Sequence, residues 1–136
     1  MSSFVLDPRL AADSHPVSAL PLCELRLIDD ARFPWLILVP RIPGVSEIID
    51  LDEDRRSALF AEIVAVSGAL RSATGCDKLN VAAIGNIVAQ LHVHAVARFR
   101  GDAAWPRPVW GFGEKVAYDK AERDRLVEKI LTALPA

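Results

Sequence analysis

The sequence predicts an α+β domain: an antiparallel sheet with one long helix packed on it and a second helix at the C-terminal end. Short segments in which polar and apolar residues alternate lie on both sides of one long segment whose apolar residues have helical spacing. Because the strands come in groups separated by a helix, rather than alternating singly with helices, they are expected to pair antiparallel.

The first two strands are expected to form a hairpin. Residues 23–28 alternate in polarity, and residues 33–40 are almost continuously apolar, which is typical of a buried strand. Residues 29–32 supply the connecting turn. Residues 41–50 then lead from the hairpin to the long helix.

The segment before the hairpin, residues 4–22, is interpreted as a lead-in with short helical pieces. Asp7-Pro8 suits the start of a helix, since proline is well tolerated at the first helical position. His15-Pro16 and Leu20-Pro21 indicate turns or extended chain, because the residue before a proline is disfavoured in a helix.

The long helix is predicted from Glu53 to Thr74. Asp52 is a suitable N-cap, and acidic residues in the first turn complement the positive end of the helix dipole. Gly75 is expected to end the helix. The predicted core face consists of the apolar residues that recur at helical spacing: Leu59, Phe60, Ile63, Val66 and Leu70.

Two further strands are expected after this helix. Residues 78–84 form the first, Gly85-Asn86 is a hairpin signal, and residues 88–99 form the second. Residues 104–111 are rich in proline and aromatic residues and are expected to be a loop. Helical spacing returns from Asp119, with four apolar residues along one side: Leu126, Ile130, Leu131 and Leu134.

Length and composition bound the class of protein. A chain of 136 residues with 51% hydrophobic and 25% charged residues suits one globular domain. We divide it into a lead-in (1–22), a core (23–111) and a C-terminal helical extension (112–136). A net charge of −2 argues against a nucleic-acid-binding surface.

The chain is expected in the cytoplasm. Its N-terminus lacks the basic region and apolar core of a signal peptide. No run approaches the ~18 consecutive apolar residues of a membrane span, so no membrane partner is expected. Cys23 and Cys76, the only cysteines, lie far apart in the sequence and favour a reducing compartment.

The most informative segment is residues 90–96, Gln-Leu-His-Val-His-Ala-Val, which holds two of the three histidines. Its strict alternation places Gln90, His92 and His94 on one face of a strand, together with Arg98. Two imidazoles about 7 Å apart on a rigid strand can bind and attack an anion. A histidine nucleophile uses one ring nitrogen, while the other carries a proton held by an acceptor.

The residues alone leave other interpretations of this pair open. A metal site would need a third ligand, and His15, the only other histidine, has no spacing that recommends it. Two structural histidines on a polar sheet face would need no ligand at all. Of the three tryptophans, Trp105 and Trp110 could cover a ligand or a partner subunit, although packing is the usual role of tryptophan.

The segment 90–96 resembles the signature of the histidine triad (HIT) family, three histidines alternating with apolar residues and followed by two apolar positions. The resemblance extends from about Cys23 to Gly111. Leu38-Val39-Pro40-Arg41 resembles the family's segment ending in an apolar pair, proline and a basic residue. Trp105-Pro106 resembles the Trp-Pro found after the signature in one branch.

This resemblance implies an α+β fold, usually a homodimer, that binds nucleotides. It also implies cleavage or transfer at the α-phosphate of dinucleoside polyphosphates or nucleoside phosphoramidates. His92 would become transiently nucleotidylated, and His94 would contact the phosphate and donate a proton. No cofactor or metal is required, although Mg²⁺ could accompany a polyphosphate substrate. The resemblance also implies that Gln90 and Asn86 orient the site. Asn80 and Asn86 would contact the phosphate, and Asp29 or Asp30 would contact the ribose.

Three positions depart from the family pattern. Gln90 occupies the first triad position and can hydrogen bond, but it carries no proton or charge near pH 7. Ile87 stands where the family often has a hydroxyl residue, and Ala97-Arg98 replaces the usual Pro-Arg. These departures favour an alternative to the enzyme: a nucleotide-binding sensor or assembly module with little or no catalysis.

Overall fold

The computed structural model describes residues 3–135 and contains one antiparallel sheet in the order β1-β2-β3-β5-β4. Every neighbouring pair of strands is antiparallel, as the sequence predicts. The strands are β1 (Ser14–Ala19), β2 (Cys23–Ile28), β3 (Trp35–Pro40), β4 (Lys78–Ala82) and β5 (Val93–Arg98). The predicted hairpin is therefore β2 and β3, and the predicted fold class is confirmed.

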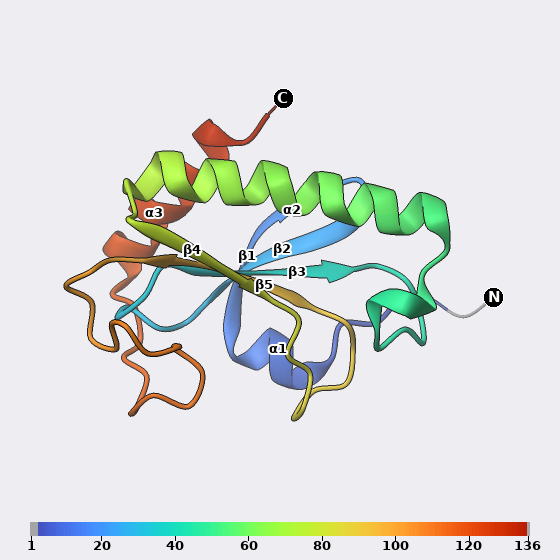
Figure 1. Ribbon diagram of the computed structural model, residues 1–136, viewed down its shortest axis with the longest axis horizontal. Helices are drawn as coiled ribbons and strands as arrows, with labels where there is room; N and C mark the ends of the chain where they lie inside the picture. The colour runs from blue at the N-terminus through green and yellow to red at the C-terminus, as the bar shows by residue number, and fades with distance from the viewer. Residues whose placement is uncertain (1–2, 136) are drawn as a thin grey trace.

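One face of the sheet is covered by α2 (Glu53–Thr74), which crosses it along its length (Figure 1). Asp52 caps the helix by accepting a hydrogen bond from the Arg55 amide, and Gly75 ends it with φ +66°. The side chains of Leu59, Ile63, Val66 and Leu70 are buried against the apolar residues of β2, β3 and β5.

Phe60 was predicted for the core face of α2, and this prediction is wrong. Its side chain is 55% exposed, because consecutive residues of a helix point about 100° apart and Leu59 already faces the sheet. Val64, one turn further along, is exposed on the same side of the helix.

The opposite face of the sheet is covered by segments from the two ends of the described chain. Residues 4–13, here called the N-terminal arm, include α1 (Pro8–Ala12), and its start at Asp7-Pro8 confirms the prediction. The apolar side chains of the arm pack against those of β3 and of the loop before β5, in a cluster made of Phe4, Leu6, Leu10, Ile28, Trp35, Ile37, Val39 and Val88. Strands β3 and β5 are consequently buried on both faces.

The strand β1 was not predicted. The two X-Pro pairs in this segment indicated turns or extended chain, and the first of them lies within an edge strand paired with β2. An edge strand tolerates proline because one side of its backbone needs no partner. The register shifts between Pro16 and Ser18, so the pairing is irregular at that point.

The hairpin predicted around Gly85-Asn86 is confirmed as the antiparallel pair of β4 and β5, but the predicted bounds of its strands are too long. The pairing of β4 with β5 ends at Ala82 and His94, and residues 83–92 form a longer loop. Gly85 serves a close approach within this loop, since a Cβ atom there would lie 2.9 Å from the carbonyl oxygen of Val88. The predicted strand 88–99 is accordingly shortened to β5.

The C-terminal part of the chain begins with residues 111–118, here called the strap, and continues into α3 (Lys120–Ala133). The helix α3 packs beside α2 through the buried side chain of Ile130, whereas Leu131 is exposed. In the part of the chain that the structure describes, none of the helices has both the length and the hydropathy to cross a bilayer.

The loop that follows β5 is fixed by a buried ion pair between Arg98 and Asp102. The Arg98 Nε and Asp102 Oδ2 atoms are 2.8 Å apart, and both side chains are at most 5% exposed. Arg98 also donates to the carbonyl oxygen of Arg107, and Asp102 accepts from the amides of Ala104 and Trp105. This network sets the path of the chain toward Trp110.

The pair makes a prediction about stability and its pH dependence. Burial raises the pKa of Asp102, but the hydrogen bonds from Arg98 and the backbone outweigh it and lower the pKa to about 2. The variant Asp102→Asn should unfold with a free energy lower by about 3 kcal/mol at pH 7, because Arg98 is left buried without a counter-charge. Urea unfolding of both proteins measures this difference.

The same difference should shrink on acidification. A carboxyl group with a lowered folded-state pKa contributes stability above its unfolded pKa, near 3.9, and loses it as the pH falls toward 2. Wild type and Asp102→Asn should therefore converge between pH 5 and pH 2. A gap that stays constant over this range would contradict a role for the Asp102 charge.

Candidate active site

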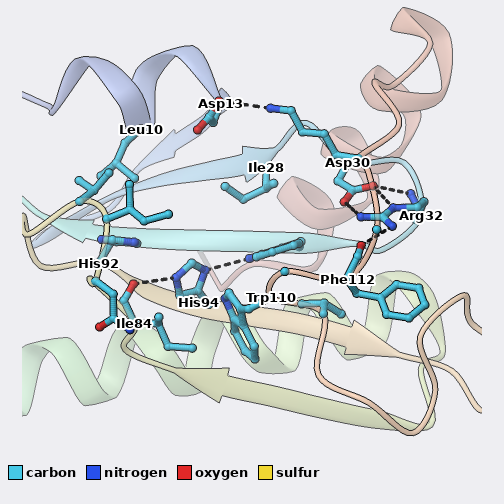
Figure 2. Close-up of a pocket in the computed structure, with 18 residues that line it drawn as sticks. Leu10, Asp13, Ile28, Asp30, Arg32, Ile84, His92, His94, Trp110 and Phe112 are labelled. Atoms are coloured by element: carbon cyan, nitrogen blue, oxygen red, sulfur yellow. Dashed lines mark hydrogen bonds and ion pairs between the residues drawn. The ribbon is translucent and has the colours of Figure 1, made fainter.

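A cavity of about 500 Å³ opens on the sheet face opposite α2. Its walls are formed by the N-terminal arm, the loop 83–92, the start of β5 and the strap. Figure 2 shows His92 and His94 toward one end of this cavity and Asp30 with Arg32 toward the other. Most of the lining is apolar or aromatic, which is typical of pockets for small molecules: Leu10, Ile28, Trp35, Ile84, Val88, Val109, Trp110 and Phe112.

The ring of His92 is held by its own backbone neighbourhood. Its Nδ1 atom lies 2.7 Å from the main-chain oxygen of Gln90. A carbonyl oxygen only accepts hydrogen bonds, so Nδ1 carries the proton and Nε2 of the neutral ring has a free lone pair. Within residues 3–135, Nε2 of His92 has no hydrogen-bond partner. A ring in this state can act as a nucleophile.

His94 is held in the opposite tautomer. The indole Nε1–H of Trp35 donates a 2.9 Å hydrogen bond to Nδ1 of His94. Because an indole nitrogen is only a donor, Nδ1 is unprotonated and the proton of the neutral ring sits on Nε2. That Nε2 atom is 3.4 Å from the carbonyl oxygen of Ile84, a long contact that a ligand oxygen could replace (Figure 2).

The surroundings of His94 keep its ring uncharged. Burial is the main cause, and the neighbouring His92 adds to it, so that the pKa of His94 is lowered to about 4. The rings of His92 and His94 are 4.9 Å apart, and Trp110 packs edge-on against His94 at 5.4 Å. At neutral pH, His94 therefore suits a neutral hydrogen-bond donor to phosphate better than the proton donor implied by the family resemblance.

The side chain of Gln90 lies outside the lining of the cavity. Its Oε1 atom accepts a hydrogen bond from the Asp7 amide, and its Nε2 atom donates to the carbonyl oxygen of Val5, both at 2.8 Å. Only the main-chain oxygen of Gln90 touches the histidine pair, through His92. Orientation of the site by the Gln90 amide stays a prediction, and the hydrogen bonds of this amide are made to the N-terminal arm.

The two asparagines predicted to contact phosphate differ in position. Asn86 lines the cavity from the loop 83–92. Asn80 lies on β4, and its Oδ1 atom accepts a 2.8 Å hydrogen bond from Nη1 of Arg98. A phosphate contact is therefore accessible to Asn86, whereas Asn80 already serves the buried network that fixes the loop after β5.

The two aspartates predicted to contact ribose are used to hold the strap. Asp29 accepts from the Tyr118 amide and faces His15, and it does not line the cavity. Asp30 does line it, but its carboxylate already accepts bonds from Arg32 and from the Val116 amide. A ribose hydroxyl would have to share or displace these donors.

The roles of several cavity residues were not predicted from the sequence. Trp35 was assigned to packing, yet it sets the tautomer of His94. Asp13 and Lys115 form an ion pair of 3.2 Å between the arm and the strap at the edge of the cavity. No local pattern marks residues separated by about a hundred positions. The alternative role suggested for Trp110, covering a ligand, agrees with its place in the cavity wall.

A metal site receives no support from the geometry. His15 lies between Asp29 and Arg123, outside the cavity. Among the described residues, no three His, Cys, Asp or Glu side chains are grouped so that they could hold a metal ion. The absence of a required metal stays a prediction, which elemental analysis of the purified protein tests.

Known proteins resemble this chain in sequence and in structure. The HIT domain family matches residues 9–101. The crystal structure of a histidine triad protein from Bradyrhizobium japonicum superposes with a TM-score of 0.97 at 48% identity, covering 98% of this chain and 100% of that one. A histidine triad protein from Sinorhizobium meliloti gives 0.95 at 44% identity, covering 96% and 97%.

A third histidine triad protein, from Marinobacter aquaeolei, superposes with a TM-score of 0.94 at 41% identity and covers 98% of this chain and 97% of that one. Among curated proteins, sequence comparison found no match.

The Trp35 hydrogen bond makes a prediction about the titration of His94. In the wild type, His94 should stay neutral above about pH 5, with its proton on Nε2. Trp35→Phe removes the donor to Nδ1, so the pKa should rise and the Nδ1–H tautomer should become populated. Nitrogen-15 NMR of the imidazoles measures both quantities.

The matched control is Trp110→Phe. Its ring also packs on His94, but its Nε1 atom has no hydrogen-bond partner among the described residues. This variant should leave the tautomer of His94 unchanged. The same tautomer shift in both variants would show that packing, rather than the Trp35 hydrogen bond, controls the ring.

Proposed function

Because the chain belongs to the histidine triad (HIT) family, we propose that it is a nucleotide hydrolase or nucleotidyl transferase acting at an α-phosphate. The observation that carries this proposal is the orientation of His92: Nδ1 is bonded to the Gln90 main-chain oxygen, which leaves Nε2 without a partner among the described residues, on the wall of a cavity of about 500 Å³. The substrate class is a nucleotide conjugate, either a dinucleoside polyphosphate or a nucleoside phosphoramidate.

The proposed reaction has two steps. The Nε2 atom of His92 attacks the α-phosphorus, and the leaving group departs with the electrons of the broken P–O or P–N bond. The ring then carries a positive charge, which the Gln90 carbonyl oxygen stabilises through the Nδ1–H bond. Water attacks the nucleotidyl-histidine in the second step and releases the nucleotide.

The other cavity residues have supporting roles in this scheme. His94 donates its Nε2–H to a phosphoryl oxygen, and the leaving group takes its proton from water. Asn86 supplies a second phosphate contact, and the aromatic walls receive the base. No cofactor is required; Mg²⁺ would belong to a polyphosphate substrate. The cytoplasm is the proposed location.

The alternative is a nucleotide-binding module that has lost efficient catalysis. It is favoured by the side chain at position 87, because Ile87 is 82% exposed and offers no hydroxyl to a phosphate. The uncharged state of His94 also favours it, since a neutral imidazole is a weaker proton donor to a leaving group than a protonated one.

Turnover distinguishes the two functions. Wild-type protein incubated with adenosine 5′-phosphoramidate and with diadenosine polyphosphates should release nucleotide and form a trapped protein adduct. His92→Ala should lower kcat by at least about 10³-fold and abolish the adduct, because it removes the nucleophile. His15→Ala, outside the cavity, is the matched control and should keep full activity. Nucleotide binding without turnover or adduct would favour the module.

We also propose that the protein is a homodimer. Phe60 and Val64 expose 55% and 70% of their surface on one side of α2, and Val81 is exposed on the edge strand β4. Exposed apolar side chains on a helix face and on an edge strand are features that a second copy of the chain could cover.

Light scattering should give about twice the chain mass of 14.8 kDa. The double variant Phe60→Glu/Val64→Glu should be a folded monomer, because two charges cannot be buried in an apolar interface. Leu131→Glu, at an exposed position of α3, is the control and should remain dimeric. A wild type that is monomeric at micromolar concentration would overturn the proposed interface.

A further inference from the structure

Gln90 connects two parts of the molecule that the proposed reaction treats separately. Its main-chain oxygen fixes the tautomer of His92, while its side chain holds the N-terminal arm. The side chain makes two bonds of opposite sense to residues two positions apart, Val5 and Asp7. In a β-sheet, a neighbouring strand makes such a pair of hydrogen bonds to an extended backbone. Here the side-chain amide of Gln90 makes them instead.

Glutamine is suited to this task. Its planar amide presents a donor N–H and an acceptor oxygen side by side. The nitrogens of an imidazole point away from each other across the ring, so a histidine at position 90 could satisfy only one of the two arm groups. Gln90, which departs from the family signature, is therefore able to bond both backbone groups of the arm.

The arm that Gln90 holds is a wall of the cavity. Directly after Asp7, the helix α1 begins, and it carries Leu10, 5% exposed, into the cavity lining. A second contact fixes the arm to the loop 83–92, since Nη1 of Arg9 donates a 3.0 Å hydrogen bond to the carbonyl oxygen of Ile87. Asp13, at the end of the arm, forms a 3.2 Å ion pair with Lys115 of the strap, and both residues line the cavity.

We propose that Gln90 is a positioning residue for substrate binding, which acts by holding the N-terminal arm as a wall of the active-site cavity. This inference rests on the proposed function. The Gln90 side chain thereby affects the affinity for the group bound in the cavity. Attack by His92 depends instead on the main-chain oxygen that orients its ring, and any residue at position 90 supplies this oxygen.

The first test measures the arm directly. Gln90→Met keeps the length of the side chain and removes both hydrogen bonds. Amide hydrogen exchange of peptides covering residues 4–13 should become faster by on the order of tenfold, as expected for the loss of one partly buried and one exposed hydrogen bond. A peptide from α2 is the internal control and should be unchanged. Equal exchange of the arm in both proteins would overturn the proposal.

The second test measures affinity and rate with adenosine 5′-phosphoramidate. Gln90→Met should raise KM at least fivefold and change kcat by less than about threefold. Arg9→Met, which removes the hydrogen bond from the arm to the Ile87 carbonyl oxygen and leaves Gln90 in place, should change KM in the same direction. A loss of kcat at constant KM in Gln90→Met, with no effect of Arg9→Met, would place Gln90 in the chemical step and overturn the proposal.

The outcome is separable from that of the proposed function. If the wild type shows neither turnover nor adduct, the hydrolase proposal fails, while hydrogen exchange of the arm still decides whether Gln90 holds it. In that case the dissociation constant of adenosine monophosphate, measured by calorimetry, replaces KM. An arm that loosens in Gln90→Met without any change in this constant would also contradict the inference.

Discussion

The central strands β3 and β5 are buried on both faces, and the candidate active-site cavity depends on how the second face of the sheet is covered. One face is covered in the usual way by the long helix α2. On the other face, the N-terminal arm packs on Ile37 and Val39, and the loop after β5, together with Phe112 of the strap, packs on Phe33. These segments leave a space between them, and His92 and His94 line it. The cavity therefore exists because segments outside the sheet form most of its walls.

Patterns within short segments predicted much of this architecture. The hairpin β2–β3, the helix α2 with its caps and the pairing of the histidines on one face all follow from periods of two and 3.6 residues and from capping preferences. The resemblance of residues 90–96 to a known signature added the nucleotide chemistry. Both histidines line the cavity, although His92 lies in the loop directly before β5 and not within the predicted strand.

Other features were beyond these patterns because they depend on distant residues. The strand β1 contains a proline and pairs only at an edge, so its propensity signal is weak. Phe60 has the polarity of a core residue, and only the position of the sheet excludes it from the core. The hydrogen bonds of Gln90 to the arm and of Trp35 to His94 join residues at least 59 positions apart. The same residue types would fit other partners equally well.

The ion pair of Asp13 and Lys115 has a consequence for how the cavity responds to its solvent. Both side chains are more than half exposed, so their attraction falls with ionic strength, over a Debye length of about 10 Å at 0.1 M. The hydrogen bonds of the Gln90 side-chain amide join neutral groups, so salt does not screen them in this way. Added salt should thus loosen the strap side of the entrance while the arm side stays closed, so that ionic strength acts on one wall alone.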